Sequence, residues 1–265
     1  MKIIENPDLT ILSLGAGVQS SVLALMAEQN LLHSKPDYAV FADTQWEPLS
    51  VYEHLDWLES QVSFPIMRVT HGNIRSDRGA AQMPVFALKP DGNKGVTWRN
   101  CTRDYKVQPI AREIKRLLGY QPRQHTKGEQ VEQWIGISTD EIGRMKDTGK
   151  KWLHNRWPLI EADMSREDCI TWFEENYPGR PLVRSACIGC PYHSNEEWAR
   201  IKFTDPTSWS DAVDYDRSLR DGRIKVGYDN PVFLHWKAVP LEEVDLNDPT
   251  PSVNLEMECE GLCGN

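Results

Sequence analysis

The residues of this chain with the clearest chemical potential are its cysteines. Cys187 and Cys190 form a Cys-x-x-Cys pair beside glycine and proline, a turn that suits tetrahedral zinc or an iron–sulfur cluster. Cys101 precedes Arg103 and Lys106, and positive charge in such a setting stabilises a thiolate or an anionic cluster. Because no second ligand pair stands at zinc spacing, a plain structural zinc site is the weaker interpretation.

A glycine-containing turn near the N-terminus is the second candidate site. Residues 13–23, SLGAGVQSSVL, follow a short apolar run and lead into an apolar helix-like segment. Glycine lets backbone N–H groups approach an anion, and the helix adds its positive N-terminal end. The spacing matches neither the dinucleotide fingerprint nor the Walker loop, and a strand-to-helix turn without a ligand is the alternative. The candidate phosphate ligands are Ser13, Gly15, Gly17, Gln19, Ser20 and Ser21.

Further candidates follow two predicted strands. Residues 37–42 read as a buried strand that ends in Asp43 and Thr44, and residues 130–137 read as another, with Gly136 near its end. Ligands of open parallel sheets bind beyond the carboxyl ends of the strands, so these residues should lie near the glycine turn. An acid at position 43 suits a ribose or a bound Mg²⁺. Alternatively, it caps the helix that follows.

The elements that must position these residues alternate between strand and helix patterns. Together with the two segments above, apolar runs at residues 9–12 and 64–69 predict an α/β fold with a doubly wound, mostly parallel sheet. Residues 72–99 lack regular periodicity and are interpreted as a flap over the nucleotide site. We divide the chain into a nucleotide-binding α/β domain, 1–185, and a small helical, cysteine-bearing C-terminal part, 186–265.

Two helix starts are predicted from Ser-x-x-acid patterns. Both residues 165–168 and residues 194–197 have the spacing of a capping box. Cys169 lies inside the first of these helices, where we interpret it as a buried small hydrophobic residue.

Composition limits the function classes. The net charge of −9 and the pI near 5.3 argue against broad binding to nucleic acid or to an anionic membrane, although a partner protein could supply contact with nucleic acid. No run reaches the ~18 apolar residues of a membrane span, and the first residues lack the apolar core of a signal peptide. We therefore expect a cytoplasmic protein, in which the six cysteines favour metal binding or thiol catalysis over disulfides.

Taken together, the motifs resemble the adenine nucleotide alpha-hydrolase (PP-loop) superfamily, and within it the phosphoadenylyl sulfate and adenylyl sulfate reductases. The turn at residues 17–21, GVQSS, is similar to the Gly-Ile-Gln loop of those enzymes. Residues 100–109, NCTRDYKVQP, followed after a long interval by the Cys-x-x-Cys pair, resemble their cluster-binding segments. The C-terminal residues 258–264, ECEGLCG, resemble a mobile Glu-Cys-Gly-Leu-His tail whose thiol attacks the sulfate sulfur.

The resemblance implies a Rossmann-like PP-loop fold, an adenine-nucleotide substrate and a 4Fe–4S cluster, with zinc as the fallback. Cys259 and Lys106 become the catalytic candidates. A thiol donor such as thioredoxin or glutathione becomes the expected partner. The implied metal ligands are Cys101, Cys187, Cys190 and Cys263.

The chain departs from the reductases in two places. Asn100 replaces the first of their tandem cysteines, which leaves Cys263, Cys259 or an open iron site as the fourth position of the cluster. Residues 136–139, GIST, lack the two arginines with which those reductases bind sulfate. A three-cysteine cluster with an open iron site resembles that of PP-loop thiolation enzymes.

Three functions therefore compete. The first is a reductase that releases sulfite and AMP, or its 3′-phosphate, through a thiosulfonate on Cys259. The second is an AMP-forming ATP pyrophosphatase that uses Mg²⁺ near Asp43 and serves tRNA thiolation or DNA phosphorothioation. The third is a non-catalytic zinc module, which would leave the glycine turn and the tail cysteine without a shared explanation.

Overall fold

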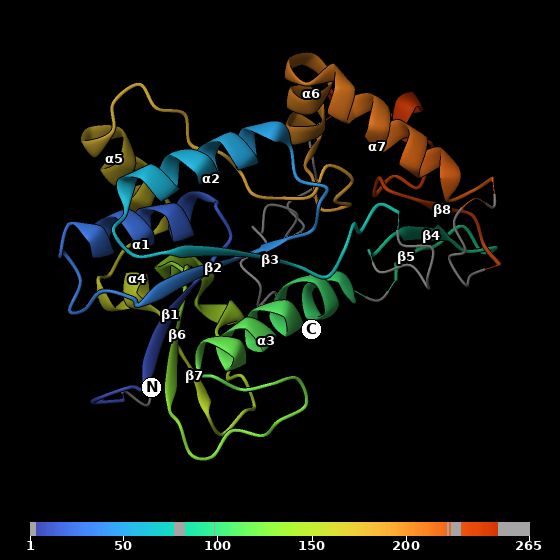
Figure 1. Cartoon of the computed structure of the whole chain (residues 1–265). Helices are drawn as coiled ribbons and strands as arrows, with labels where there is room; N and C mark the ends of the chain where they lie inside the picture. The colour runs from blue at the N-terminus through green and yellow to red at the C-terminus, as the bar shows by residue number, and fades with distance from the viewer. Residues whose placement is uncertain (1–3, 77–82, 98, 222, 224–228, 249–265) are drawn as a thin grey trace.

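The computed structural model describes residues 4–76, 83–97, 99–221, 223 and 229–248 (Figure 1). In chain order the elements are β1 (Leu9–Leu14), α1 (Val18–Glu28), β2 (Tyr38–Asp43), α2 (Leu49–Gln61), β3 (Ile66–Thr70), β4 (Phe86–Leu88), β5 (Lys94–Val96), the π-helical turn η1 (Thr102–Val107), α3 (Gln108–Leu117), β6 (Val131–Ile135), the 3-10 helix η2 (Thr139–Arg144), β7 (Leu153–Arg156), α4 (Pro158–Glu161), α5 (Arg166–Asn176), α6 (Asn195–Thr204), α7 (Pro206–Ser218), β8 (Val232–Phe233) and the 3-10 helix η3 (Leu241–Glu243).

The larger sheet sets the position of the glycine turn. Within the described ranges it has five strands in the order β3-β2-β1-β6-β7, and every neighbouring pair is parallel. The chain moves outwards from β1 to β3 and then returns to place β6 and β7 on the other side. The strand order therefore reverses between β1 and β6, the place where open α/β sheets bind ligands. The predicted α/β class with a mostly parallel sheet is confirmed.

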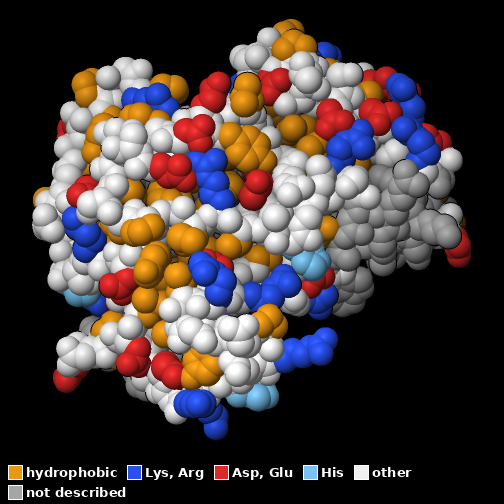
Figure 2. All heavy atoms as spheres, viewed as in Figure 1, with side chains coloured by type: hydrophobic (Ala, Val, Ile, Leu, Met, Phe, Trp, Pro, Cys, Tyr) orange, Lys and Arg blue, Asp and Glu red, His pale blue; other side chains and the backbone are white. Residues whose placement is uncertain are grey.

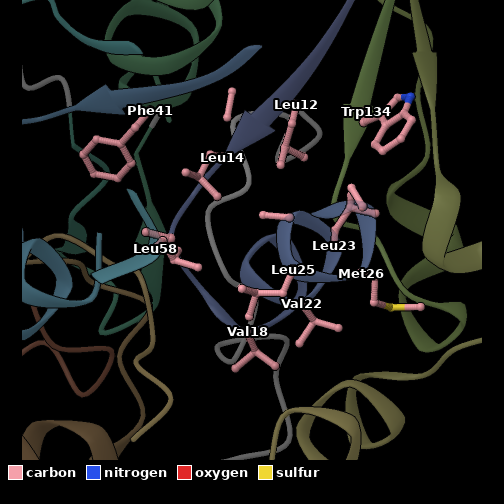
Figure 3. Packing of buried hydrophobic residues seen from close by; sticks show 14 of the residues in the cluster. Leu12, Leu14, Val18, Val22, Leu23, Leu25, Met26, Phe41, Leu58 and Trp134 are labelled. Carbon is pink, nitrogen blue, oxygen red and sulfur yellow. The ribbon is translucent and has the colours of Figure 1, made fainter. Parts of the chain in front are cut away.

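Both faces of this sheet are covered by apolar side chains. Successive side chains of β1 point to opposite faces and belong to two different apolar clusters. Leu12 and Leu14 belong to the apolar cluster that includes Leu23 and Leu25 of α1, and Figure 3 shows these side chains gathered between strands and helix. Ile11 belongs to a different cluster, which includes residues of α3. Burial on two faces explains why all six residues of β1 are buried, and why its apolar residues do not follow a strict alternation with polar ones.

A second apolar cluster lies at the other end of the molecule, beside α6, α7 and the small sheet (Figure 1). It joins residues distant in sequence, such as Trp46, Tyr105, Ile188 and Trp198. In this region β4 pairs antiparallel with both β5 and β8. The predicted division of the chain after residue 185 stays a prediction.

The interpretation of residues 72–99 as a segment without regular structure is corrected by β4 and β5. Each of these strands has three residues, too few to show an alternating pattern in the sequence. Their connection is a tight turn in which Asp91 Oδ1 accepts a hydrogen bond from the backbone N–H of Asn93 at 2.9 Å. Gly92 supplies the positive φ of 80° that this turn requires.

The predicted helix starts are confirmed, one of them only in part. Ser165 and Asp168 form a reciprocal capping box at α5. Ser194 Oγ accepts the N–H of Glu197 at 3.2 Å, but the Glu197 carboxylate pairs with Arg200 instead of completing the box. Cys169 is fully buried in the main apolar cluster, as predicted.

Charges of both signs are mixed on the face shown in Figure 2, where Lys and Arg side chains lie among Asp and Glu side chains. Arg68, for example, contacts Asp56 at 2.5 Å and Glu59 at 2.8 Å. None of the helices in the described part of the chain is both long enough and apolar enough to cross a bilayer.

Candidate functional site

The glycine turn connects the carboxyl end of β1 to α1, and its serine side chains face the protein interior. Ser13, Ser20 and Ser21 are buried, and Ser20 Oγ accepts a hydrogen bond from the backbone N–H of Gly15 at 3.2 Å. The residue with left-handed backbone geometry is Ala16, with φ of 58°, rather than a glycine. The turn therefore begins α1 at the reversal point of the sheet, where a phosphate-binding loop is expected.

Gln19 ties this turn to the segment that leaves β6. Its amide nitrogen donates to Ser138 Oγ at 3.3 Å and to Glu141 Oε2 at 3.1 Å, and its amide oxygen accepts from Arg166 Nη1 at 2.8 Å. Because Gln19 is fully buried and bound at both ends of its amide, its orientation is fixed. Its side chain connects three elements: α1, η2 and α5.

Gly136 lies directly against the start of α1. A Cβ atom at this position would lie 2.9 Å from the backbone nitrogen of Ser20 and 3.0 Å from its Cα. Only glycine lets the segment after β6 approach the helix this closely. The structure thus places Gly136 next to the glycine turn. This agrees with the expectation that residues at the carboxyl ends of the predicted strands lie near that turn.

Asp43 and Thr44 take different positions although they are adjacent in sequence. Asp43 Oδ1 accepts hydrogen bonds from the backbone N–H of Gln45 at 2.7 Å and from the Tyr52 hydroxyl at 2.8 Å. Burial, with the Asp43 carboxylate as a further cause, raises the pKa of Tyr52. Thr44 is buried and turns towards the cysteines, with its Oγ1 3.3 Å from the Sγ of Cys187.

Three of the predicted metal ligands line one pocket. Cys101, Cys187 and Cys190 surround it together with Lys106, Thr44 and Arg99, and apolar side chains complete the wall. These residues come from three separate stretches of the chain. Cys259 and Cys263, the other cysteines predicted to act here, lie outside the described residues.

The Cys187 side chain is half-buried, and its thiol lies in a partly acidic setting. Its Sγ lies 3.6 Å from Oε1 of Glu47, the same oxygen that accepts the Thr44 hydroxyl at 3.0 Å. Burial, reinforced by the charge of Glu47, raises the pKa of Cys187 well above its ordinary value, while the charge of Lys106 acts in the opposite direction. Lys106 is itself almost fully buried in η1.

The Cys-x-x-Cys turn is held from several sides. The N–H of Cys190 donates to the carbonyl of Cys187 at 2.9 Å, and that carbonyl also lies 3.0 Å from Nε2 of His193. Burial, with Arg184 nearby, lowers the pKa of His193 to about 4, which keeps the ring neutral at pH 7. The N–H of Ile188 donates to the carbonyl of Trp46 at 2.8 Å.

Sequence reasoning missed two residues of this pocket region, Trp46 and Glu47. Both follow the predicted strand end at Asp43 and Thr44, so an acid four residues beyond a ligand-edge aspartate was a usable signal. Nothing in the sequence indicated that the indole of Trp46 packs against the turn between the two cysteines. Two arginines near Gln19 were also missed. Arg166 donates directly to Gln19, and Arg144 forms an ion pair with Glu141, which in turn contacts Gln19.

Within the residues that the structure describes, no set of three or more His, Cys, Asp or Glu side chains is placed to hold one metal ion.

No protein-family model matches the chain, and a search of curated proteins gave no significant match.

Proposed function

We propose that this chain is a PP-loop adenine-nucleotide enzyme of sulfur metabolism, similar to the iron–sulfur-dependent adenylyl sulfate reductases. The observation that carries the proposal is the pocket shared by Cys101, Cys187, Cys190 and Lys106. It adjoins the ligand edge of the sheet through Thr44, which directly follows β2. A cysteine-lined pocket next to a predicted nucleotide loop suits a reaction in which a nucleotide carries the sulfur group.

The donor set of the pocket, three thiols around one space, suits a 4Fe–4S cluster. Zinc requires its sulfur ligands about 2.3 Å from one point, whereas cysteines that hold a 4Fe–4S cluster bind through different iron atoms and stand farther apart. Cys101, Cys187 and Cys190 would hold the cluster, and Cys263 or an open iron would complete it. When bound, such a cluster supplies electrostatic influence on a nearby sulfate.

The chain's own residues would carry out the remaining steps. The glycine turn at residues 13–21 would bind the adenylate phosphate, and Lys106 would neutralise charge beside the thiolates. The Cys259 thiolate would attack the sulfuryl sulfur, and the sulfur–oxygen bond to the phosphate would break as AMP leaves with the electron pair. A dithiol or two thiols of thioredoxin or glutathione type would then reduce the thiosulfonate, releasing sulfite and forming a disulfide.

A second candidate is an AMP-forming ATP pyrophosphatase that serves sulfur transfer to nucleic acid. It is favoured by the acids at the same sheet edge, because Asp140 and Glu141 follow β6 directly after positions 138 and 139, where serine and threonine stand in place of the arginines of the reductases. Carboxylates at this edge suit Mg²⁺ bound to a triphosphate. Asp43 would be the further ligand on the β2 side.

One anaerobic preparation tests both candidates. Iron and acid-labile sulfide should be present in the wild type, lost in Cys187→Ser and Cys190→Ser, and retained in Cys169→Ala, the matched control in which a buried cysteine outside the pocket is removed. A colourless, iron-free wild-type protein would contradict the cluster, and a zinc content with no nucleotide binding would favour the non-catalytic module.

Product analysis then separates the two enzymes. The reductase should release sulfite from adenylyl sulfate or its 3′-phosphorylated form in the presence of thiol, and Cys259→Ser should abolish that release. Pyrophosphate release from ATP without sulfite formation would instead establish the second candidate. Full sulfite release by Cys259→Ser would remove this residue from the mechanism.

A further inference from the structure

Two loops meet at the amino end of the large sheet, on the side opposite the candidate site. Residues 118–130 lead into β6 and residues 145–152 lead into β7, so both loops lie at the lower end of the molecule in Figure 1. Because β6 and β7 are parallel neighbours, with Val131 paired with Leu153, the loops that precede them lie side by side. The N–H of Val131 also donates to the carbonyl of Trp152 at 2.8 Å.

The charge of this region differs from that of the whole chain. Residues 112–130 contain five Lys or Arg and two acids, and residues 146–151 contain three Lys and one acid, whereas the chain as a whole has 39 acids and 30 Lys or Arg. Both acids of the first segment already have partners. Glu113 pairs with Arg116 at 2.6 Å, and Glu129 accepts a backbone N–H of its own loop at 2.7 Å. A local excess of positive charge therefore lies on an acidic protein.

Lys115, near the end of α3, joins the two loops. Its Nζ donates to the carbonyl of Gln124 in the first loop at 3.0 Å and lies 5.8 Å from the ring centre of Trp152 in the second loop. Burial, with the charge of Lys115 as a further cause, lowers the pKa of Lys150. Two half-buried ammonium groups are thus held near each other, although like charges repel unless an anion lies between them.

Hydrogen bonds fix the second loop in this position. Thr148 Oγ1 donates to the carbonyl of Leu153 at 2.5 Å and accepts the backbone N–H of Lys150 at 3.1 Å. The side-chain amide of Asn155 donates to the carbonyl of Lys146 at 2.7 Å. Because the loop is already ordered, a ligand would bind there with little further loss of conformational entropy.

We propose that Lys115, Lys150 and the exposed side chains of Arg123, Lys127 and Lys151 form a surface that binds the phosphate backbone of a nucleic acid. Within the described ranges of the chain, none of these five cations forms an ion pair with a carboxylate. Lys and Arg that neutralise phosphates release counterions, which supplies most of the affinity of sequence-independent binding. The inference goes beyond the proposed function, because it adds a macromolecular partner whichever of the two enzymes is present.

The surroundings of the five cations favour a nucleic acid over an acidic protein. Protein interfaces have an apolar or aromatic centre. Neither loop contains any of the large hydrophobic residues that are exposed in the described part of the chain, which are Leu31, Leu49, Val96, Ile142 and Phe203. A surface hollow of the first loop is instead lined in part by Gln124, His125 and Lys127, whose side chains can donate to phosphate oxygens.

The experiment measures the binding of labelled single-stranded RNA and DNA, each about 20 nucleotides long and of mixed sequence, by fluorescence anisotropy from about 50 to 200 mM salt. The affinity of the wild type should fall with salt. Each lost phosphate contact should reduce the slope of log K against log salt by about 0.7, so Lys115→Gln combined with Lys150→Gln should reduce it by about 1.4. The same double variant should weaken binding at the lowest salt by about tenfold or more.

Lys202→Gln is the matched control for the double variant. Lys202 also lies over a tryptophan ring, that of Trp209 at 5.2 Å, but it belongs to α6 and to neither loop. This variant should keep the wild-type affinity and the wild-type slope. Comparison of the RNA with the DNA identifies which nucleic acid the surface binds more tightly.

Three results would overturn the inference. The first is wild-type protein that binds neither oligonucleotide, or binds without salt dependence. The second is unchanged affinity and slope in the double variant, since the nucleic acid would then bind elsewhere. The third is displacement of the oligonucleotide by polyglutamate as readily as by unlabelled oligonucleotide, since the surface would then accept acidic protein segments. Thermal unfolding identifies a misfolded variant, and Lys151→Glu, at an exposed position, decides the question if the double variant does not fold.

Discussion

The α-carbon of Gly189 faces the indole of Trp46 so closely that a methyl group on it would lie 2.2 Å from Cη2 and 2.6 Å from Cζ3 of the ring. The glycine in the Cys-x-x-Cys turn is therefore required by packing. Trp46 cannot easily move aside, because its Nε1 donates to Asp211 at 2.5 Å and its ring packs on Tyr215 with a centroid distance of 4.8 Å. The second apolar cluster thus determines the shape of the cysteine turn.

We expect Gly189→Ala to displace either the indole or the turn. Overpacking of this kind costs typically 1–3 kcal/mol, so the free energy of unfolding should fall by about that amount in urea titrations. The iron content of the anaerobic protein should fall as well, because the positions of Cys187 and Cys190 depend on this turn. Gly143→Ala is the control, since a methyl group there meets no atom within 4 Å. Equal stability and iron content in the two variants would contradict the packing argument.

The hydroxyl of Thr44 provides a second test of the cysteine pocket. Thr44→Val keeps the shape of the side chain but removes the donor to Glu47, whose carboxylate is buried. Loss of a hydrogen bond to a buried charged group should lower the free energy of unfolding by about 1–3 kcal/mol. Thr44→Ser keeps the hydroxyl and should cost less. If urea unfolding gives the same stability for both variants, the Thr44–Glu47 contact does not stabilise the fold.

The sequence predicted well those features that depend on local pattern. The strands at β1, β2, β3 and β6 are long enough to show an apolar run, and the box at Ser165 has a fixed spacing. The missed features depend on long-range packing. Glu47 meets Cys187 across 140 residues of chain, and no local pattern encodes that approach. The contact between Trp46 and Gly189 is likewise long-range, because it depends on the apolar cluster that Trp46 forms with residues of α7.

The close approach of Gly136 to α1 predicts that a larger residue at position 136 would disturb the glycine turn. In Gly136→Ala the new methyl group would meet backbone atoms of Ser20, which cannot rotate away as a side-chain end could. We expect the segment after β6 to move outwards, with a loss of about 1–3 kcal/mol in unfolding free energy and weaker AMP binding. Calorimetric AMP titration measures the binding effect, with Gly143→Ala again as control. Wild-type affinity for AMP in Gly136→Ala would show that the loop does not depend on this contact.

Buried histidines should make the protein sensitive to mild acid. His54 lies 2.9 Å from the hydroxyl of Ser21 in α1, and burial, with Arg180 as a further cause, lowers its pKa from 6.5 to about 4. His235 is shifted to about 4, mainly by burial and also by Lys237. Below pH 6.5 the unfolded chain binds protons that these folded-state rings do not. Stability is therefore full above about pH 6.5 and is lost progressively as the pH falls towards 4.

A shift of this size is worth about 3 kcal/mol for one ring when the pH falls through the whole interval. Urea titrations at several pH values between 7 and 4 should therefore show a steep fall in stability for the wild type. His54→Gln, which can still hydrogen-bond to Ser21, should show a shallower fall. His125→Gln, a substitution at an exposed position, should retain the wild-type slope. Equal slopes in all three proteins would mean that the His54 ring is protonated as readily in the folded state as in the unfolded state.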